Sequence, residues 1–110
     1  MARVRLETAR ISDATTFHEE CQRALGFPAF YGKNMDAWID CMTYLDDPSA
    51  GMSRVTVPPG EVLTLHLENM AAFAKRCPKQ YTDLIECAAF VNWRRIDHGE
   101  PAVLALSFYG

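Results

Sequence analysis

Apolar and polar positions follow two different periods along the 110-residue chain. Alternation over residues 3–8 predicts a half-buried strand, with its apolar side chains on one face and its charged side chains on the other. Two denser apolar runs, at 61–67 and 102–108, have the length and composition of strands buried on both sides. The pattern therefore predicts three strands.

Four further segments carry apolar residues at helical spacing. In the longest, over 79–98, apolar residues that include Ile85 and Ile96 cover a broad arc, which we expect to be buried. The four expected helices are one capped by Ser12 and ended by Gly26, one from the cap Asn34 to 46–47, a short one over 70–75, and the one over 79–98.

The expected element order is β-α-α-β-α-α-β. Strands separated by helices imply right-handed crossovers and therefore a parallel sheet. We expect an α/β fold, with a small three-stranded parallel sheet packed with about four helices that cover mainly one face. Residues 1–110 are expected to form a single domain. The pattern leaves the order of the strands in the sheet open.

The helix that begins at Asn34 has two unlike faces. With 100° per residue and Asp36 at zero, Asp40 lies at about 40° and Thr43 at about −20°. Between about 140° and 240° lie only apolar residues, which we expect to pack on the core. These residues are Trp38, Cys41, Met42 and Leu45.

The acidic face of this helix requires an explanation. Two carboxylates at i and i+4 repel each other by roughly 0.2–0.5 kcal/mol. The helix dipole favours Asp36 in the first turn, but it does not favour Asp40, and Lys33 is the only base nearby in the sequence. The face is either an ordinary solvated surface or a site for a cationic partner.

An aromatic loop precedes the same helix. Pro28 disfavours helix at the residue before it, and Gly32 permits a positive φ or a close backbone approach. Phe30 and Tyr31 follow each other in this loop. They are expected either to fold back on the core or to be exposed as interface anchors.

The stretch FPAFYGKNMDAWIDCMT, residues 27–43, resembles the signature of the barstar family of intracellular inhibitors of secreted ribonucleases. The resemblance implies a barstar-like fold and a proteinaceous inhibitor. Such an inhibitor would block the active site of a ribonuclease or nuclease toxin with the acidic helix and the adjacent aromatic loop. The residues that carry the resemblance are Pro28, Phe30, Tyr31, Gly32, Asn34, Asp36, Trp38, Ile39, Asp40, Cys41 and Thr43.

The resemblance also assigns roles to residues. Asp40 would lie at the centre of the contact, among the cations of the partner, and Asp36 would reinforce it from the preceding turn. The residues expected to border the contact are Asn34, Met35, Ile39 and Thr43 on the helix, and Phe30, Tyr31 and Gly32 on the loop.

The chain departs from the family pattern around this site. Tyr44 and Leu45 replace a Gly-Trp pair, and Phe30 lacks the hydroxyl of the tyrosine that is common there. Where the best-known member contributes an acid from its last helix, this chain has Arg94 and Arg95. We expect these two cations to lie on the rim of the acidic face.

Composition and charge exclude one further class of function, direct binding to nucleic acid. The chain is 49% hydrophobic and 23% charged, as in an ordinary globular protein, and its net charge is −3. A mildly acidic chain lacks the basic footprint of sequence-independent nucleic-acid binding, so we expect no direct contact with nucleic acid. We expect the free protein to be a monomer, although exposed Tyr31 and Ile39 could promote self-association at high concentration.

The four cysteines indicate the compartment. No C-x-x-C pair is present, so neither a zinc ribbon nor a redox motif is indicated. Each cysteine lies in or next to an expected helix, so we expect buried free thiols, which are typical of a reducing compartment. The first residues have no apolar core of a signal peptide, and no run approaches the ~18 apolar residues of a membrane span. We therefore expect a cytoplasmic protein. The cysteines are Cys21, Cys41, Cys77 and Cys87.

An enzyme is the first alternative. Asp36 and Asp40 could be an acid–base pair, joined by His66 or His98. However, the sequence has no Gly-rich phosphate loop, nucleophile elbow or metal-ligand cluster, so we expect no catalysis, cofactor or metal. We interpret His66 as a strand residue, His98 as a helix-end residue, and His18, beside two glutamates, as solvated.

The second alternative is a diverged barstar-fold binding module whose partner is not a nuclease. Such a module would keep the fold and lose the inhibitory activity, and the sequence alone leaves it open.

Overall fold

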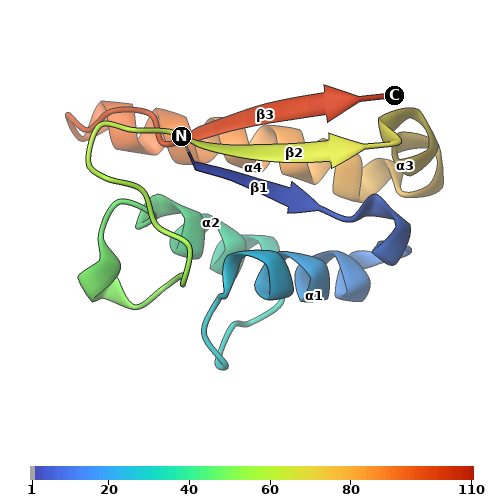
Figure 1. Ribbon diagram of the computed structural model, residues 1–110, viewed down its shortest axis with the longest axis horizontal. Coiled ribbons are helices and arrows are strands. Elements are labelled where there is room, and N and C mark those ends of the chain that lie inside the picture. The colour runs from blue at the N-terminus through green and yellow to red at the C-terminus, as the bar shows by residue number, and fades with distance from the viewer. Residues whose placement is uncertain (1) are drawn as a thin grey trace.

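The computed structural model describes residues 2–110 and has the expected α/β fold (Figure 1). Two short 3₁₀ helices, η1 (Thr8–Arg10) and η2 (Pro48–Ala50), supplement the regular elements. The expected order β-α-α-β-α-α-β is confirmed. The elements are β1 (Ala2–Leu6), α1 (Ala14–Leu25), α2 (Met35–Thr43), β2 (Leu63–Glu68), α3 (Met70–Arg76), α4 (Pro78–Asp97) and β3 (Leu104–Tyr109).

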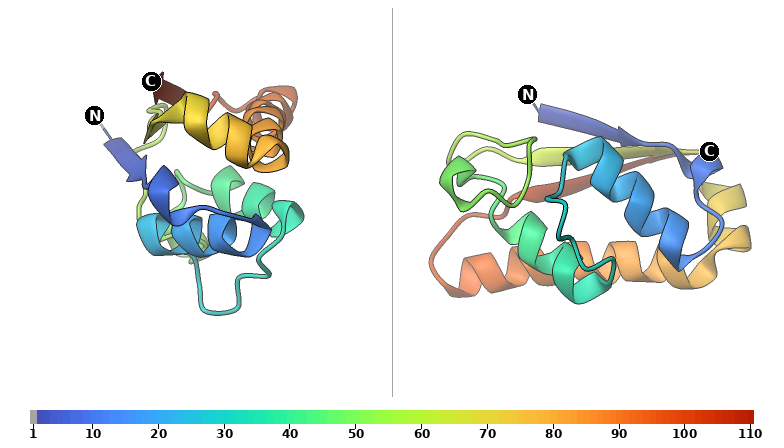
Figure 2. Two further views of the ribbon diagram at one scale, coloured as in Figure 1. Left: turned by 90° about the vertical axis from the view of Figure 1, so that its right-hand side faces the viewer. Right: turned by 90° about the horizontal axis from the view of Figure 1, so that it is seen from below.

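The three strands form a parallel sheet in the order β1-β2-β3. In register, Val4 pairs with Leu65 and Leu65 pairs with Leu106, so these three side chains share one face. Helices α1, α2 and α4 all lie on the same side of the sheet (Figure 2, left). The expectation that helices cover mainly one face is confirmed.

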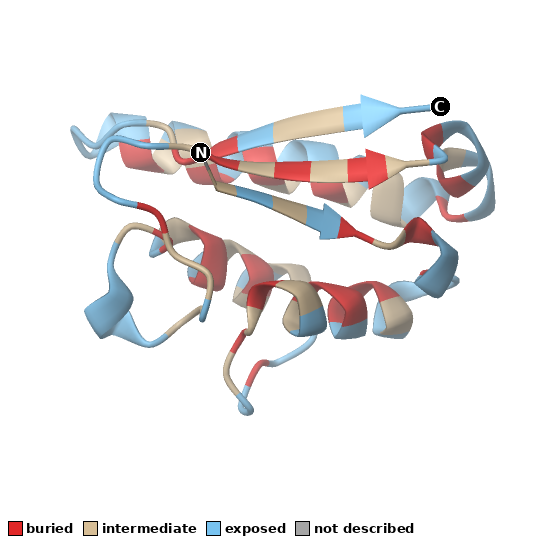
Figure 3. Cartoon of the chain, viewed as in Figure 1, coloured by how far each residue is buried: buried red, intermediate tan, exposed pale blue. Residues whose placement is uncertain are grey.

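The expectation that the second and third strands are buried on both sides is wrong. In β2, three fully buried leucines alternate with Thr64, His66 and Glu68, which are only partly buried. In β3, an edge strand, only Leu104 is buried, and the strand becomes exposed towards its end (Figure 3). Because no helix within residues 2–110 covers the second face, the apolar residues of these strands contribute to the core from one side only.

The core lies between the sheet and the helices. Its largest fully buried side chains include Trp38 and Phe17. In α4 the buried stripe is narrower than expected, because Ile85, Trp93 and Ile96 are exposed. The buried positions of α4 are Leu84, Ala88, Val91 and Arg95.

The caps and turns around α1 and α2 differ from expectation. Asp13, not Ser12, caps α1, since its carboxylate accepts from the Thr16 amide at 2.8 Å in a capping box. In the turn before α2, Lys33 has a positive φ of +53°, whereas the φ of Gly32 is not positive. Helix α2 ends at Thr43, earlier than expected.

The connection over residues 49–60 returns to the end of α1. The Arg54 amide donates to the carbonyl oxygens of Leu25 at 3.1 Å and of Gly26 at 3.0 Å. Gly26 has a φ of +71°, and a Cβ at this position would overlap the Cβ of Arg54. Glycine is therefore required at this position for two reasons: the backbone is left-handed, and the connection approaches too closely for a Cβ.

Candidate functional site

Helix α2 is anchored by its apolar face, as expected. Asn34 caps it, because its side-chain oxygen accepts from the Ala37 amide at 2.8 Å. Trp38, Cys41 and Met42 are buried against the core. The N-terminus and the inner face of the helix therefore hold its outer face in one orientation.

The outer face of α2 carries both carboxylates to the surface. Asp36 is exposed, and the side chain of Asp40 is 61% exposed. Met35 and Ile39 are partly buried and pack against the core, so the expected exposure of Ile39 is wrong. The surface of the helix is therefore acidic rather than mixed acidic and apolar.

Arg94 of α4 reaches across to this acidic face. One of its terminal nitrogens lies 3.6 Å from a carboxylate oxygen of Asp40, and the same nitrogen donates to the Thr43 hydroxyl. That hydroxyl in turn donates to the Ile39 carbonyl at 2.6 Å. The guanidinium carbon of Arg94 lies 5.8 Å from the centre of the Phe90 ring. Asp40 therefore already has a cationic neighbour within the protein.

Arg95 is used differently, although it is the next residue. Its side chain is only 2% exposed and donates to both carboxylate oxygens of Asp46, at 3.1 and 2.6 Å. It also donates to the carbonyl oxygens of Thr43, at 2.7 Å, and of Pro101, at 2.9 Å. The expectation that both arginines lie on the rim is therefore wrong for Arg95. Its role is to hold the C-terminal end of α2.

A pocket of about 290 Å³ lies beside Asp40, between the C-terminal ends of α2 and α4. Its lining combines both signs of charge with the exposed aromatic ring of Tyr44. His98 Nδ1 lies 2.8 Å from the Arg94 carbonyl oxygen. The lining residues are Asp40, Thr43, Tyr44, Arg94, Arg95, His98 and Glu100.

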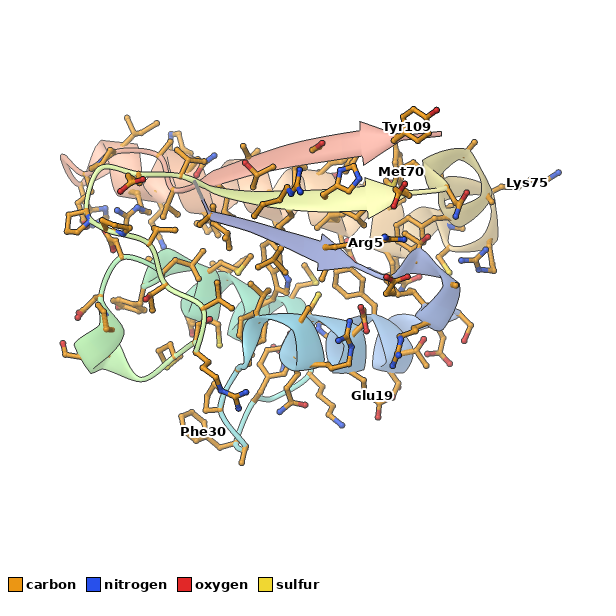
Figure 4. The ribbon with its side chains drawn as sticks, in the orientation of Figure 1. Arg5, Glu19, Phe30, Met70, Lys75 and Tyr109 are labelled. Atoms are coloured by element: carbon orange, nitrogen blue, oxygen red, sulfur yellow. The ribbon has the colours of Figure 1, made fainter. Side chains whose placement is uncertain are left out.

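The aromatic loop places its two rings in opposite environments. Phe30 is 76% exposed and points away from the molecule at the tip of the loop (Figure 4). Tyr31 is only 6% exposed, and its hydroxyl lies 2.6 Å from Nδ1 of His18. Its ring also packs against Phe27, with centroids 4.8 Å apart. Of the two alternatives for the loop aromatics, Tyr31 folds back on the core and so is not exposed for self-association, whereas Phe30 is exposed. The expected solvation of His18 is wrong.

The burial of His18 has a sequence signal that glutamate neighbours conceal. His18 lies three residues before Cys21 and seven before Leu25, which are both core residues, so it belongs to the same helical stripe. Burial lowers the pKa of His18, and the carboxylate of Asp83 opposes this effect. Burial also raises the pKa of Tyr31. The two rings therefore form a neutral pair near neutral pH.

Gly32 and Lys33 complete the turn from the loop into α2. A Cβ at Gly32 would lie 3.3 Å from the side-chain nitrogen of Asn34, tighter than an ordinary contact. Lys33 lies 3.6 Å from Glu19 of α1, an exposed ion pair. Gly32 and Asn34 are exposed beside the acidic face, so the turn adds polar backbone to the same surface.

Of the two histidines that could join an acid–base pair in an enzyme, only one lies near the acidic face. His98 lines the pocket with Asp40. His66 bonds to Ser107 at 2.9 Å on the uncovered face of the sheet, opposite the helices. Within residues 2–110, no three side chains of His, Cys, Asp or Glu are grouped so that they could hold a metal ion.

The comparisons with known proteins agree with this architecture. The model of the family described as Barstar (barnase inhibitor) matches residues 1–106. No curated protein matches the chain. In the described part of the chain, no helix combines the length and the hydrophobicity needed to cross a membrane. Since members of the matched family are inhibitors rather than enzymes, the match indicates a ribonuclease-inhibitor role. The family match covers nearly the whole chain, and we conclude that the chain belongs to the barstar family.

Proposed function

We propose that the protein inhibits a basic ribonuclease, or a nuclease toxin, by inserting the acidic face of α2 into the active site. The observation that carries the proposal is the placement of Asp40: its carboxylate is 61% exposed on a helix whose two ends are both held. A carboxylate presented in this way can enter a cationic groove.

The chemistry of the partner explains why an acidic helix can block it. A ribonuclease must bind phosphates, so its active site presents arginine, lysine and often histidine. Carboxylates can replace the phosphates there, because charge-assisted hydrogen bonds to arginine are short and strong. The complementary electric fields also speed encounter, and added salt should slow it.

The proposed contact residues fall into three groups. The exposed group makes direct contact, with Asp40 at the centre. The partly buried group forms the border of the contact. Tyr31 makes no direct contact in this proposal; its buried ring supports the loop that presents Phe30. The exposed group is Phe30, Gly32, Asn34, Asp36 and Asp40, and the border group is Met35, Ile39 and Thr43.

Location and partnership form the finer part of the proposal. All four cysteines are free, and burial raises the pKa of Cys21 to about 12 and that of Cys41 to about 11. Thiols in that state are unreactive near neutral pH, which suits a reducing cytoplasm. We propose a cytoplasmic monomer that protects the cell from a nuclease, as an immunity protein does.

The test compares two isosteric variants that remove one negative charge each. Asp40→Asn should weaken inhibition of the ribonuclease by about 10- to 150-fold for each charged hydrogen bond lost, because such bonds are worth about 1.5–3 kcal/mol each. Glu61→Gln, at an exposed carboxylate outside the proposed contact, should inhibit like the parent. The assay is RNA cleavage by barnase and by a panel of other basic ribonucleases, titrated with each protein.

Thermal unfolding should give the same midpoint for Asp40→Asn and the parent, since Asp40 is a surface residue. If Asp40→Asn inhibits as well as the parent, the acidic face is not the site. If the parent inhibits none of the ribonucleases but captures a protein that is not a nuclease, the second candidate is correct: a barstar-fold module with another partner.

A further inference from the structure

The carboxylate at the centre of the proposed contact is already close to a cation. Arg94 lies 3.6 Å from Asp40, and its side chain is only 31% exposed, against 61% for Asp40. The hydrogen bond to Thr43 and the packing over the Phe90 ring fix its position. Arg94 therefore stays beside Asp40 in the free protein.

This arrangement affects any cation that approaches Asp40. A partner arginine or lysine must either displace Arg94 or bind with a like charge beside it. Displacement would cost the contacts with Thr43 and Phe90, and coexistence would cost electrostatic repulsion. A partner whose groove holds only cations therefore loses binding free energy in either case.

A partner of mixed charge avoids both costs. If its groove places a carboxylate, or another anionic acceptor, next to the cation that meets Asp40, that acceptor can bind Arg94. The ion pair within the inhibitor would then be replaced by two ion pairs across the interface. The pocket beside Asp40 has a mixed lining, which includes Arg94, His98 and the carboxylate of Glu100.

We propose that Arg94 is a specificity-determining residue of the inhibitory face, and that it favours a ribonuclease whose groove pairs a cation with a neighbouring anionic group. This inference rests on the proposed function, because it concerns the same face. It assigns to Arg94 a role in choosing the partner, and to Arg95 a role only in the fold.

The experiment uses the ribonuclease panel as the probe, divided into ribonucleases whose active-site groove holds only cations and ribonucleases in which a carboxylate lies beside those cations. Arg94→Gln removes the competing charge and keeps a side chain of similar length. Lys75→Gln is the matched control, since it changes the net charge equally at an exposed residue of α3 outside the site. Dissociation constants and association rates are measured at low and high salt, for each variant alone and combined with Asp40→Asn.

Arg94→Gln should bind the ribonucleases with a purely cationic groove about tenfold more tightly than the parent at low salt, mainly through faster association, and should bind those of mixed charge no more tightly. The gain should disappear when Asp40→Asn is also present, because Arg94 acts through that carboxylate. Lys75→Gln should show at most the small gain that follows from net charge.

Two results would overturn the inference and leave the inhibitor proposal standing. The first is that Arg94→Gln binds no more tightly than Lys75→Gln while Asp40→Asn loses binding. The second is that the gain persists in the Asp40→Asn background. An equal gain on both classes of ribonuclease would also overturn the inference, because Arg94 would then not choose between partners. The inhibitor proposal is decided separately by whether Asp40→Asn loses binding, and it fails together with the inference if neither the parent nor Arg94→Gln binds any ribonuclease.

Discussion

The hydroxyl of Tyr31 and Nδ1 of His18 lie 2.6 Å apart in the interior, and this hydrogen bond closes the aromatic loop onto α1. The two residues are thirteen positions apart, so the bond links the loop to a helix that ends before the loop begins. Phe30 can project into solvent because its neighbour is held in this way.

The burial of His18 makes stability depend on pH. Its pKa is lowered from 6.5, chiefly by burial, so the unfolded chain binds a proton at a pH where the folded protein does not. The free energy of unfolding should therefore fall as the pH drops from about 7.5 through 6.5 towards the lowered pKa. Urea unfolding at about pH 7.5, 6.5 and 5.5 measures this change.

His18→Gln should remove most of that dependence, since glutamine keeps a hydrogen-bonding group and does not titrate. His66→Gln is the control and should retain it, because His66 lies on the uncovered face of the sheet. Equal dependence in the parent and His18→Gln would show that another group titrates.

Substitutions of the two loop aromatics should separate binding from stability. Phe30→Ala should change the free energy of unfolding by less than about 0.5 kcal/mol, because the ring is exposed, and should weaken ribonuclease binding. Tyr31→Phe should cost about 1–3 kcal/mol of stability, because it leaves His18 without its buried partner. Chemical denaturation and inhibition assays on both variants test the contrast, which the reverse pattern would contradict.

The same substitution at the two adjacent arginines should cost very different amounts of stability. Arg95→Met should destabilise the protein by about 3 kcal/mol, because it leaves the carboxylate of Asp46 and two carbonyl oxygens without a donor. Arg94→Met should cost less than about 1 kcal/mol, because its ion pair with Asp40 is exposed. Thermal and urea unfolding of both variants provide the measurement, and similar losses would refute the division of roles.

Two glycines with left-handed backbones make another matched pair. Gly26→Ala should cost about 2–3 kcal/mol, since it adds backbone strain and a collision with Arg54. Gly51→Ala should cost only about 1 kcal/mol, because a Cβ there meets nothing within 4 Å. Equal losses of unfolding free energy would show that the connection moves aside at Gly26.

The sequence predicts the fold and the acidic face well, because both depend on local periodicity. Asn34 is of a residue type that commonly caps helices, and it caps α2. Trp38 lies on the apolar arc and is fully buried. The acidic positions follow from the same helical count. Burial on one face of the sheet, by contrast, depends on how many helices pack against it, which the apolar runs of β2 and β3 do not encode.

The misplaced residues of the site have partners in distant segments. His18 is followed by two glutamates and looks solvated, and its buried hydrogen-bond partner, Tyr31, comes from the loop. Arg94 and Arg95 are indistinguishable in composition and differ only in what α2 offers to each of them. The helical period shows that the two side chains point in different directions. Only the packed structure shows that Arg94 meets Asp40 and Arg95 meets Asp46.

The two attachments of α2, at Asn34 and through Arg95, have an entropic consequence. A flexible acidic segment would lose backbone freedom when it enters a groove, at about 1–2 kcal/mol for each residue that becomes ordered. In this protein that loss is incurred during folding, so little of it remains to oppose association. A substitution that frees either end of the helix should therefore weaken binding without removing a single contact.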